Sequence, residues 1–223
     1  IFLVSISVCS YLTFDYAVSV ENNYSALFQS PSLAYPFGTD NFGRCIFSRI
    51  VFGARISLSV GMAAIVIPLL VGGTLGSIAG YYGKAVDNII MRMLDTLYAI
   101  PSILLAIAII ASFGASTISL IMAISIAGIP VYARLVRATV LGIANSEYVE
   151  AAKACGATNR IIIFKHIVPN SLAPLIVRST LEIGTAVLST STLSYLGIGI
   201  PAHIPEWGNV LRAGSTYLEE HPY

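Results

Sequence analysis

The sequence predicts an all-α fold, a bundle of helices that cross a lipid bilayer several times. Only 10% of the 223 residues are charged and 56% are hydrophobic, whereas soluble domains carry about 25% charged residues. Two long runs, residues 56–83 and 96–133, contain no charged residue at all. Because one membrane-spanning helix needs about 20 apolar residues, the first run is long enough for one helix and the second for two.

Five spans follow from the positions of the charges and turns. We expect them at residues 1–20, about 56–82, 89–112, 117–140 and 172–196, with a turn at Phe113–Thr117 between the third and the fourth. Residues 1–20 have neither the basic flank nor the cleavage site of a signal peptide, so they are interpreted as a truncated span. A sixth span is expected beyond Tyr223.

The segments between the spans are assigned to the two sides of the membrane by their lysines and arginines. If the first span enters from the cytoplasm, seven of these residues face the cytoplasm and four face outward, as the positive-inside rule requires. Residues 21–55 are then an extracytoplasmic loop, 141–170 a cytoplasmic loop and 197–223 an extracytoplasmic segment. Because Phe42, Ile46, Ile50 and Gly53 recur at helical spacing, we expect an amphipathic helix on the outer surface within 21–55.

Two features predict how the spans are shaped and packed. Gly72, Gly76 and Gly80 recur at steps of four in the second span. Glycines at this spacing make one helix face flat, so that another helix can approach closely. Pro101 and Pro130 are expected to kink the third and fourth spans.

Polar residues within the spans are the candidates for a translocation path. Charges are costly in a bilayer unless they face water or each other, which singles out Asp95, Arg178 and Glu182. For Arg178 and Glu182, four residues apart, the alternative is a pair on one helix face; for Asp95 it is a position at the wet interface. Ser189 and Thr190 begin the hydroxyl-rich run "STSTLSY", which could line a wet pore or form hydrogen bonds between helices.

Several classes of site are absent from the sequence. The net charge of +1 provides no basic surface for nucleic acid, and Cys9, Cys45 and Cys155 form no CxxC pair for zinc or redox chemistry. The chain has no GxxxxGK[ST] loop to bind nucleotide phosphates and no HExxH or GxSxG motif. We therefore expect no metal, no cofactor and no enzyme activity.

A charged stretch, "EYVEAAKACGATNRIIIFKHIVPN", fills residues 147–170 between the last two spans. Glu150 and Lys153 suit the two ends of a short helix and could form an ion pair. Gly156 is expected to end this helix, a second short helix follows, and Pro169 is expected to open the fifth span.

The first of these helices carries unusually small side chains on its surface. Ala151, Ala152 and Ala154 form a patch flanked by Tyr148 and Val149, over which the groove of a partner protein could close. The alternative is a plain connector, since alanine is also the best helix former.

The same stretch resembles the cytoplasmic EAA loop of the membrane (permease) subunits of binding-protein-dependent ABC importers. Glu150, Ala151, Ala152, Gly156 and Pro169 fall at the positions of that pattern. Three further stretches, "FGTDNFGR", "GYYGKAVDNIIMRMLDTLYAIPS" and "LSYLGIGIPAHIPEWGNVL", resemble the dipeptide, oligopeptide and nickel branch. The resemblance extends from Pro36 to Tyr223.

The resemblance implies the type I importer membrane-domain fold and a channel-forming subunit of an ATP-driven importer. Such a subunit pairs with a second homologous membrane subunit, two cytoplasmic ATP-binding subunits and an external substrate-binding protein. It lies in the bacterial or archaeal cell membrane as a multi-pass protein and works by alternating access, with the EAA loop coupled to the ATPases.

Two alternatives remain for the transported substrate and for the mechanism. Di- and oligopeptides are the expected substrates, while nickel or another chelated metal uses closely similar subunits. An ATP-independent secondary transporter is the alternative of a different class, suggested only by Arg178 and Glu182. An ATPase bound through residues 147–166 would distinguish the importer from this transporter.

Overall fold

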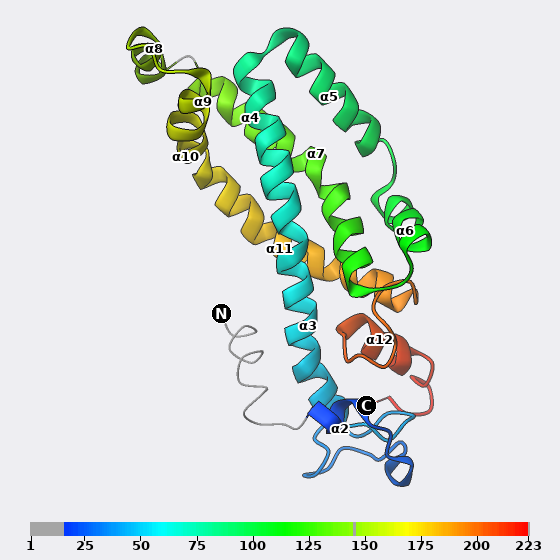
Figure 1. Ribbon diagram of the computed structural model, residues 1–223. Coiled ribbons are helices and arrows are strands. Elements are labelled where there is room, and N and C mark those ends of the chain that lie inside the picture. The colour runs from blue at the N-terminus through cyan, green and yellow to red at the C-terminus, as the bar shows by residue number, and fades with distance from the viewer. Residues whose placement is uncertain (1–15, 145, 223) are drawn as a thin grey trace. The chain divides into compact units, whose positions relative to one another are not determined.

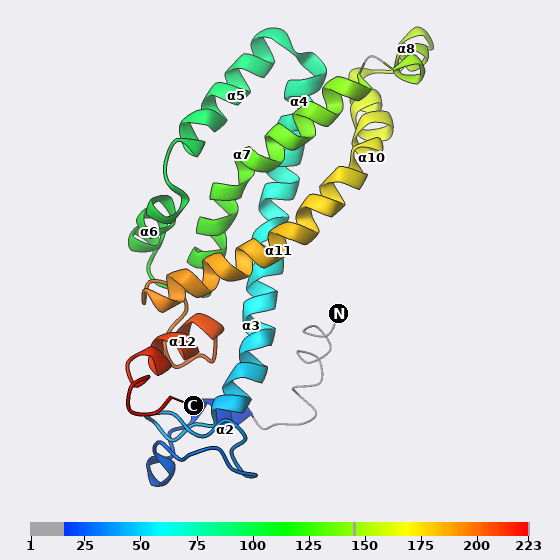
Figure 2. The same ribbon diagram turned by 180° about the vertical axis from the view of Figure 1, so that it is seen from behind.

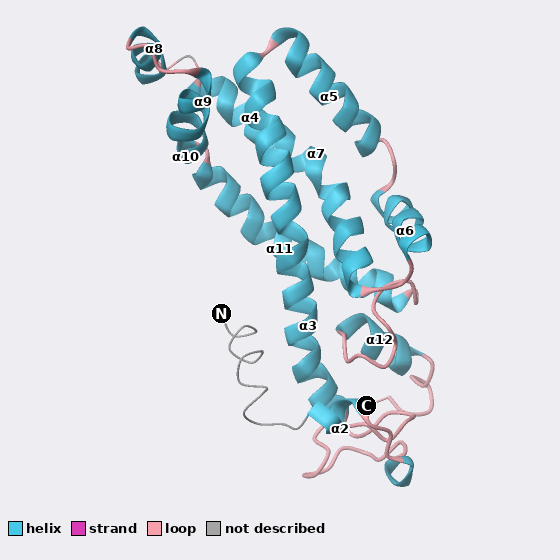
Figure 3. Cartoon of the chain, viewed as in Figure 1, coloured by secondary structure: helices cyan, strands magenta, loops and turns pink. Residues whose placement is uncertain are grey.

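A computed structural model describes residues 16–144 and 146–222 of the chain, and this part consists of helices joined by turns and loops (Figure 3). The described residues contain no strand, only one isolated antiparallel bridge between Thr39 and Cys45. The all-α prediction is therefore confirmed.

The helices carry the labels of Figure 1. In chain order they are α2 (Tyr16–Val20), η1 (Tyr24–Ala26), α3 (Ile46–Ile67), η2 (Pro68–Gly72), α4 (Gly73–Tyr82), α5 (Lys84–Tyr98), α6 (Ser102–Phe113), α7 (Thr117–Ile143), α8 (Glu147–Ala154), α9 (Asn159–Ile161), η3 (Ile162–Ile167), α10 (Val168–Asn170), α11 (Leu172–Tyr195) and α12 (Trp207–Ser215). η1 is a 3-10 helix, and η2 and η3 are π-helical. Helices α3, η2 and α4 run on without interruption from Ile46 to Tyr82.

By length and composition, three helices of the described residues could cross a membrane. They are Ile46–Tyr82, Thr117–Ile143 and Leu172–Tyr195. A fourth is possible if α5 and α6, bent by 82° at their junction, form one broken span. These helices overlap the ranges 56–82, 89–112, 117–140 and 172–196, whose assignment as membrane spans stays a prediction. Most of the expected first span, residues 1–20, lies outside the described residues.

One expectation about these helices was wrong and another was confirmed. Residues 21–55, all of which the structure describes, contain no separate amphipathic helix, because α3 starts at Ile46 and continues to Ile67, and its Arg49 is buried instead of lying on a surface. The kink expected at Pro101 is confirmed, since α5 ends at Tyr98, α6 starts at Ser102, and the two are bent by 82° at their junction. Pro101 explains this break, because it lacks an N–H and disfavours helix at the residue before it. Pro130, in contrast, lies within the unbroken α7.

The chain divides into two compact units. One contains the described part of residues 1–62 with residues 109–121 and 185–222, and the other contains residues 63–108 and 122–184. The first is called the α12 unit and the second the α8 unit, after a helix that each contains.

In the α8 unit, α4 and η2 pack against α7 along the glycines that the sequence singles out. A Cβ atom on Gly72 would lie 2.7 Å from the carbonyl oxygen of Ile129, and one on Gly80 would lie 2.9 Å from Cβ of Val140. At Gly76 a Cβ atom would collide with the carbonyl oxygen of Ala133. The predicted flat face therefore exists, and the helix that approaches it is α7.

In the α12 unit, a buried carboxylate holds the start of α12. Glu206 is 0% exposed, and its Oε2 accepts hydrogen bonds from the backbone N–H groups of Gly208 and Asn209 at 2.8 and 3.2 Å. Its Oε1 accepts from the hydroxyls of Ser57 in α3 at 3.1 Å and Ser191 in α11 at 2.8 Å. Glu206 thus caps α12 and joins it to two other helices.

Replacing Glu206 with alanine is expected to lower the free energy of unfolding by about 3 kcal/mol, because four donors lose a charged acceptor inside the unit. Glu219→Ala, at an exposed glutamate beyond α12, is the control and is expected to change stability by less than about 0.5 kcal/mol. The measurement is the thermal unfolding midpoint of both variants in detergent. Equal midpoints would contradict the structural role of Glu206.

Candidate coupling site

The charged stretch of residues 147–170 begins with α8, whose first turn is fixed by Ser146. Ser146 has extended backbone angles and its hydroxyl donates to the carbonyl of Ile143 at 2.7 Å, so it does not cap the helix through its side chain. Its carbonyl oxygen accepts from the N–H groups of Val149 and Glu150 at 3.0 and 3.1 Å. Glu147 and Glu150 lie in the first turn, where the helix dipole favours negative charge.

Gly156 ends α8, as predicted. Its φ angle of 80° lies in the left-handed region, where only glycine is free of steric cost. The N–H of Gly156 donates to the carbonyl of Lys153 at 3.0 Å, and that of Ala157 donates to Ala152, also at 3.0 Å. These two bonds are the Schellman motif, which turns the chain sharply at a helix end.

α8 has one buried face and one exposed face, and the expected alanine patch is divided between them. Val149 is 0% exposed within the apolar core of the α8 unit, and Ala152 packs against the same core. The exposed face is formed by Glu147, Tyr148, Glu150, Ala151, Lys153 and Ala154. Val149 therefore does not belong to the exposed surface that the sequence suggested, because at helical spacing it points to the core, and Ala152 lies half-buried beside it.

Lys153 makes a different contact from the one predicted. Its ammonium lies 5.4 Å from the centre of the Tyr81 ring, and no ion pair with Glu150 occurs among the described residues. The Tyr81 hydroxyl in turn forms a hydrogen bond of 2.8 Å with Oδ1 of Asn159. Tyr81 thus connects the end of α4 to α8 and to the start of the next helix.

The chain between α8 and α11 is helical but contains two irregular segments. η3 is π-helical, and its Ile162, Ile163 and Ile167 are buried. Pro169 lies in α10, and a turn at Ser171 separates it from α11, so Pro169 precedes the long helix but does not open it. π-Helical segments occur frequently at functional sites.

Both views of the chain show α8, α9 and α10 at the same end of the α8 unit as the turn between α4 and α5 (Figures 1 and 2). This end gathers Glu150, Ala151, Ala152 and Gly156, with Pro169 close behind in the chain. Of these, Glu150, Ala151, Gly156 and Pro169 are exposed and Ala152 is half-buried.

The charged candidates for the path are paired. Nη2 of Arg178 lies 2.6 Å from Oε2 of Glu182 on the same helix, and both side chains are partly exposed. Asp95 is 61% exposed and lies 3.9 Å from Nη1 of Arg134, whose guanidinium also covers the ring of Tyr98. The pairing alternative for Arg178 and Glu182 is thus what the structure shows.

The hydroxyl candidates lie in the α12 unit. Ser189 is half-buried, whereas Thr190 is 0% exposed and its Oγ1 has no hydrogen-bond partner among the described residues. The neighbouring Ser191 is bonded to Glu206, and Ser194 Oγ accepts from the N–H of Ile200 at 3.3 Å. Thr190 is therefore enclosed in this structure, while Ser191 and Ser194 form hydrogen bonds within the α12 unit.

Sequence reasoning missed one strong ion pair of the α8 unit. Arg137 in α7 binds both carboxylate oxygens of Asp87 in α5, at 2.5 and 2.6 Å. The charge pattern assigns no partner to Arg137, which lies near the end of the expected span 117–140; in the structure α7 continues to Ile143. The available signal was Asp87 itself, the only acidic residue between residues 41 and 94, although its neighbours Lys84 and Arg92 offered nearer partners than Arg137.

Comparison with known proteins places this arrangement in a family. Residues 72–218 match the model of the family described as "Binding-protein-dependent transport system inner membrane component". These residues include every element from α4 to α12 and therefore the whole of the candidate coupling site.

Three relatives are similar along most of the chain. The dipeptide transport system permease protein DppC of Alkalihalophilus pseudofirmus is 49% identical over 203 residues, which are 91% of this chain and 67% of the relative. The glutathione transport system permease protein GsiD of Pectobacterium atrosepticum is 40% identical over 90% of this chain and 67% of its own length. The oligopeptide transport system permease protein OppC of Bacillus subtilis is 39% identical over the full 223 residues and 72% of its own length. The chain is therefore a membrane-embedded permease component that belongs to the family of inner membrane components of binding-protein-dependent transport systems.

Proposed function

We propose that this chain forms part of the translocation channel of an ATP-driven importer for di- and oligopeptides. The peptide class is supported by the names of its relatives, which are permeases for dipeptides and oligopeptides. The other components of the importer would be a second homologous membrane subunit, two cytoplasmic ATP-binding subunits and an external substrate-binding protein. The complex would lie in the cell membrane of a bacterium or archaeon.

The observation that carries the coupling part of the proposal is the geometry of α8. Val149 and Ala152 anchor this helix in the core of its unit, while Glu150 and Ala151 remain exposed. A short helix held in this way can transmit a push from a docked ATPase, because its buried face shares a core with α7 and α11. Glu150, Ala151, Ala152, Gly156 and Pro169 are therefore proposed as the coupling residues.

For the path through the membrane, Asp95, Arg178, Glu182 and Ser189 are proposed to contribute polar surface. Asp95, Arg178 and Glu182 are all partly exposed, Asp95 in the charged helix α5 and the other two in the largely apolar α11. Such charges are tolerated where water or a polar cargo reaches them. Thr190 is proposed to have a structural role instead, since it is fully enclosed.

The docking proposal is tested by replacing Ala151 with tryptophan in the full-length chain expressed with its partner subunits. The large side chain is expected to prevent a groove from closing over α8, so that at least tenfold less ATP-binding subunit co-purifies and uptake of radiolabelled dipeptide falls in proportion. Ala202→Trp, at an exposed alanine just before α12, is the matched control. It is expected to retain wild-type co-purification of the ATP-binding subunit and wild-type dipeptide uptake.

Three outcomes would contradict the proposal, each in a different part. If Ala151→Trp retains the ATP-binding subunit and uptake, α8 is not the docking helix. If the wild-type complex hydrolyses ATP in response to Ni²⁺ but not to peptides, the chain belongs to a metal importer. If no ATP-binding subunit accompanies the chain at all, a secondary transporter replaces the importer.

A further inference from the structure

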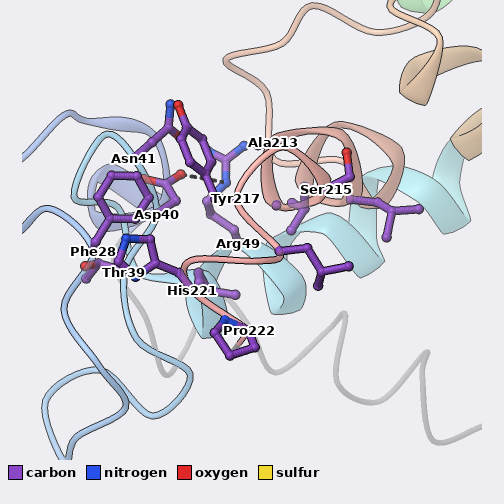
Figure 4. A pocket seen from close by; sticks show the side chains of 15 residues that line it. Phe28, Thr39, Asp40, Asn41, Arg49, Ala213, Ser215, Tyr217, His221 and Pro222 are labelled. Carbon is purple, nitrogen blue, oxygen red and sulfur yellow. Dashed lines mark ion pairs between the residues drawn. The ribbon is translucent and has the colours of Figure 1, made fainter.

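The α12 unit contains a pocket of about 320 Å³ at the start of α3. Its wall is formed by the loop before α3, the first turn of that helix, and the end of α12 with the residues that follow (Figure 4). The volume lies at the small end of the range for small-molecule sites, which is about 300–1,000 Å³. The pocket is separate from the coupling site, which belongs to the other unit.

The pocket contains a buried cation that lacks a full set of partners. Arg49 is 1% exposed; its Nη1 donates to the carbonyl of Ser19 at 2.9 Å, and its Nε lies 3.8 Å from Oδ2 of Asp40. Its Nη2 is buried and has no hydrogen-bond partner among the described residues. Figure 4 shows Arg49 and Asp40 joined by this ion pair among the lining side chains.

Asp40 does not neutralise Arg49, because Arg44 occupies it. Nε and Nη2 of Arg44 each lie 2.8 Å from Oδ2 of Asp40. Oδ1 of Asp40 accepts hydrogen bonds from the backbone N–H groups of Phe42 and Arg44, both at 2.9 Å. Arg44 is 5% exposed. The cluster therefore contains two buried guanidinium groups and one carboxylate, which leaves an excess positive charge. An anion at Nη2 of Arg49 would compensate it, since an unpaired buried charge is strongly unfavourable.

The rest of the pocket favours a partly apolar ligand. The ring of Phe28 stacks on His221 at 4.3 Å between centroids and meets the edge of Tyr217 at 4.9 Å. Oδ1 of Asn41, another lining residue, is buried and accepts no hydrogen bond from the described residues. The pocket thus offers a donor to an anion, an acceptor to an N–H group and an aromatic wall.

We propose that this pocket binds small organic carboxylates that have an apolar body, such as N-acylated amino acids. The carboxylate accepts a hydrogen bond from Nη2 of Arg49, the ligand's amide N–H donates to Oδ1 of Asn41, and the apolar body lies against Phe28 and Tyr217. Arginine suits this role because its guanidinium stays charged when buried and matches the planar carboxylate. The proposal does not depend on the energy source or the cargo of the transporter.

The test uses the full-length chain with its partner subunits in lipid nanodiscs and two probes of nearly equal shape. Radiolabelled N-acetyl-L-phenylalanine carries the carboxylate, and N-acetyl-L-phenylalanine amide lacks the charge. In equilibrium dialysis the acid is expected to bind at least tenfold more tightly than the amide, as a hydrogen bond to a charged group implies. Arg49→Met is expected to remove this preference.

A second variant keeps the test valid if Arg49→Met does not fold. Leu218 lines the pocket and is exposed, so Leu218→Trp is expected to fill the pocket and weaken binding of the acid at least tenfold while leaving Arg49 intact. Leu33→Trp, at a fully exposed leucine of the loop outside the pocket, is the matched control and is expected to bind normally.

Three results would overturn the proposal. One is equal binding of the acid and the amide, and another is binding that Leu218→Trp does not reduce. The third is capture of an external protein that requires Arg49 while neither probe binds, which would assign the pocket to an acidic side chain of that protein. None of these results bears on whether α8 docks an ATPase.

Discussion

Gly76→Leu is expected to remove most of the folded protein from the membrane fraction. A Cβ atom at this position collides with the carbonyl oxygen of Ala133 and lies 2.9 Å from Cβ of Val136, both in α7. The obstruction includes backbone, which cannot rotate away as a side chain can. Overpacking of a core costs about 1–3 kcal/mol even where side chains can adjust. Because leucine at Gly76 would push α4 away from α7, its free-energy cost is expected to exceed this range.

Gly73→Leu provides a stringent control three residues earlier on the same helix. Nothing lies within 4 Å of a Cβ atom at Gly73, and leucine is a better helix former than glycine. This variant is therefore expected to reach wild-type abundance and to show a wild-type unfolding midpoint in detergent. Gel-filtration yield and thermal unfolding of both variants make the comparison. Equal behaviour of the two would show that α7 does not pack on the Gly76 face.

The glycine spacing shows how far sequence reasoning extends into this fold. Gly72, Gly76 and Gly80 reveal a flat face, because the spacing of small residues is a local property of one helix. The spacing contains no information on which helix covers that face. The partner, α7, lies some 50 residues further along the chain, and only the folded arrangement identifies it.

The residues that were missed share this dependence on distant partners. Glu206 accepts from Ser57 and Ser191, and Arg49 is buried although its segment was expected to form an amphipathic helix on the outer surface. Their environment comes from segments far away in the chain. In α8, by contrast, the stop at Gly156 was predictable because a helix end is decided by a few neighbouring residues. The inward orientation of Val149 and Ala152 needed the core that η3 and α11 provide.

Gly156→Val is expected to leave the protein inserted and folded but to lower transport-coupled ATP hydrolysis at least tenfold. No atom lies within 4 Å of a Cβ atom at Gly156, so the effect does not come from a clash. It comes from the φ angle of 80°, which costs a β-branched residue about 1–3 kcal/mol. To relieve this strain, the chain would give up the hydrogen bonds that end α8 at Lys153 and Ala152.

Gly156→Asn separates the backbone effect from the effect of adding any side chain, because asparagine adopts left-handed angles more readily than other residues with a Cβ atom. In reconstituted complexes, peptide-stimulated ATP hydrolysis and peptide uptake are expected to remain near wild type with asparagine and to be lost with valine, while thermal unfolding midpoints stay similar. Coupling is expected to differ between the two variants because the turn at Gly156 sets the direction in which the exposed face of α8 points. The unfolding midpoints are expected to be similar because Val149 holds the helix in the core in both variants. If valine and asparagine both couple normally, the orientation of α8 does not matter for coupling. If both fail, the surface at Gly156 itself contacts the ATPase, and the Schellman turn is not the reason for the glycine.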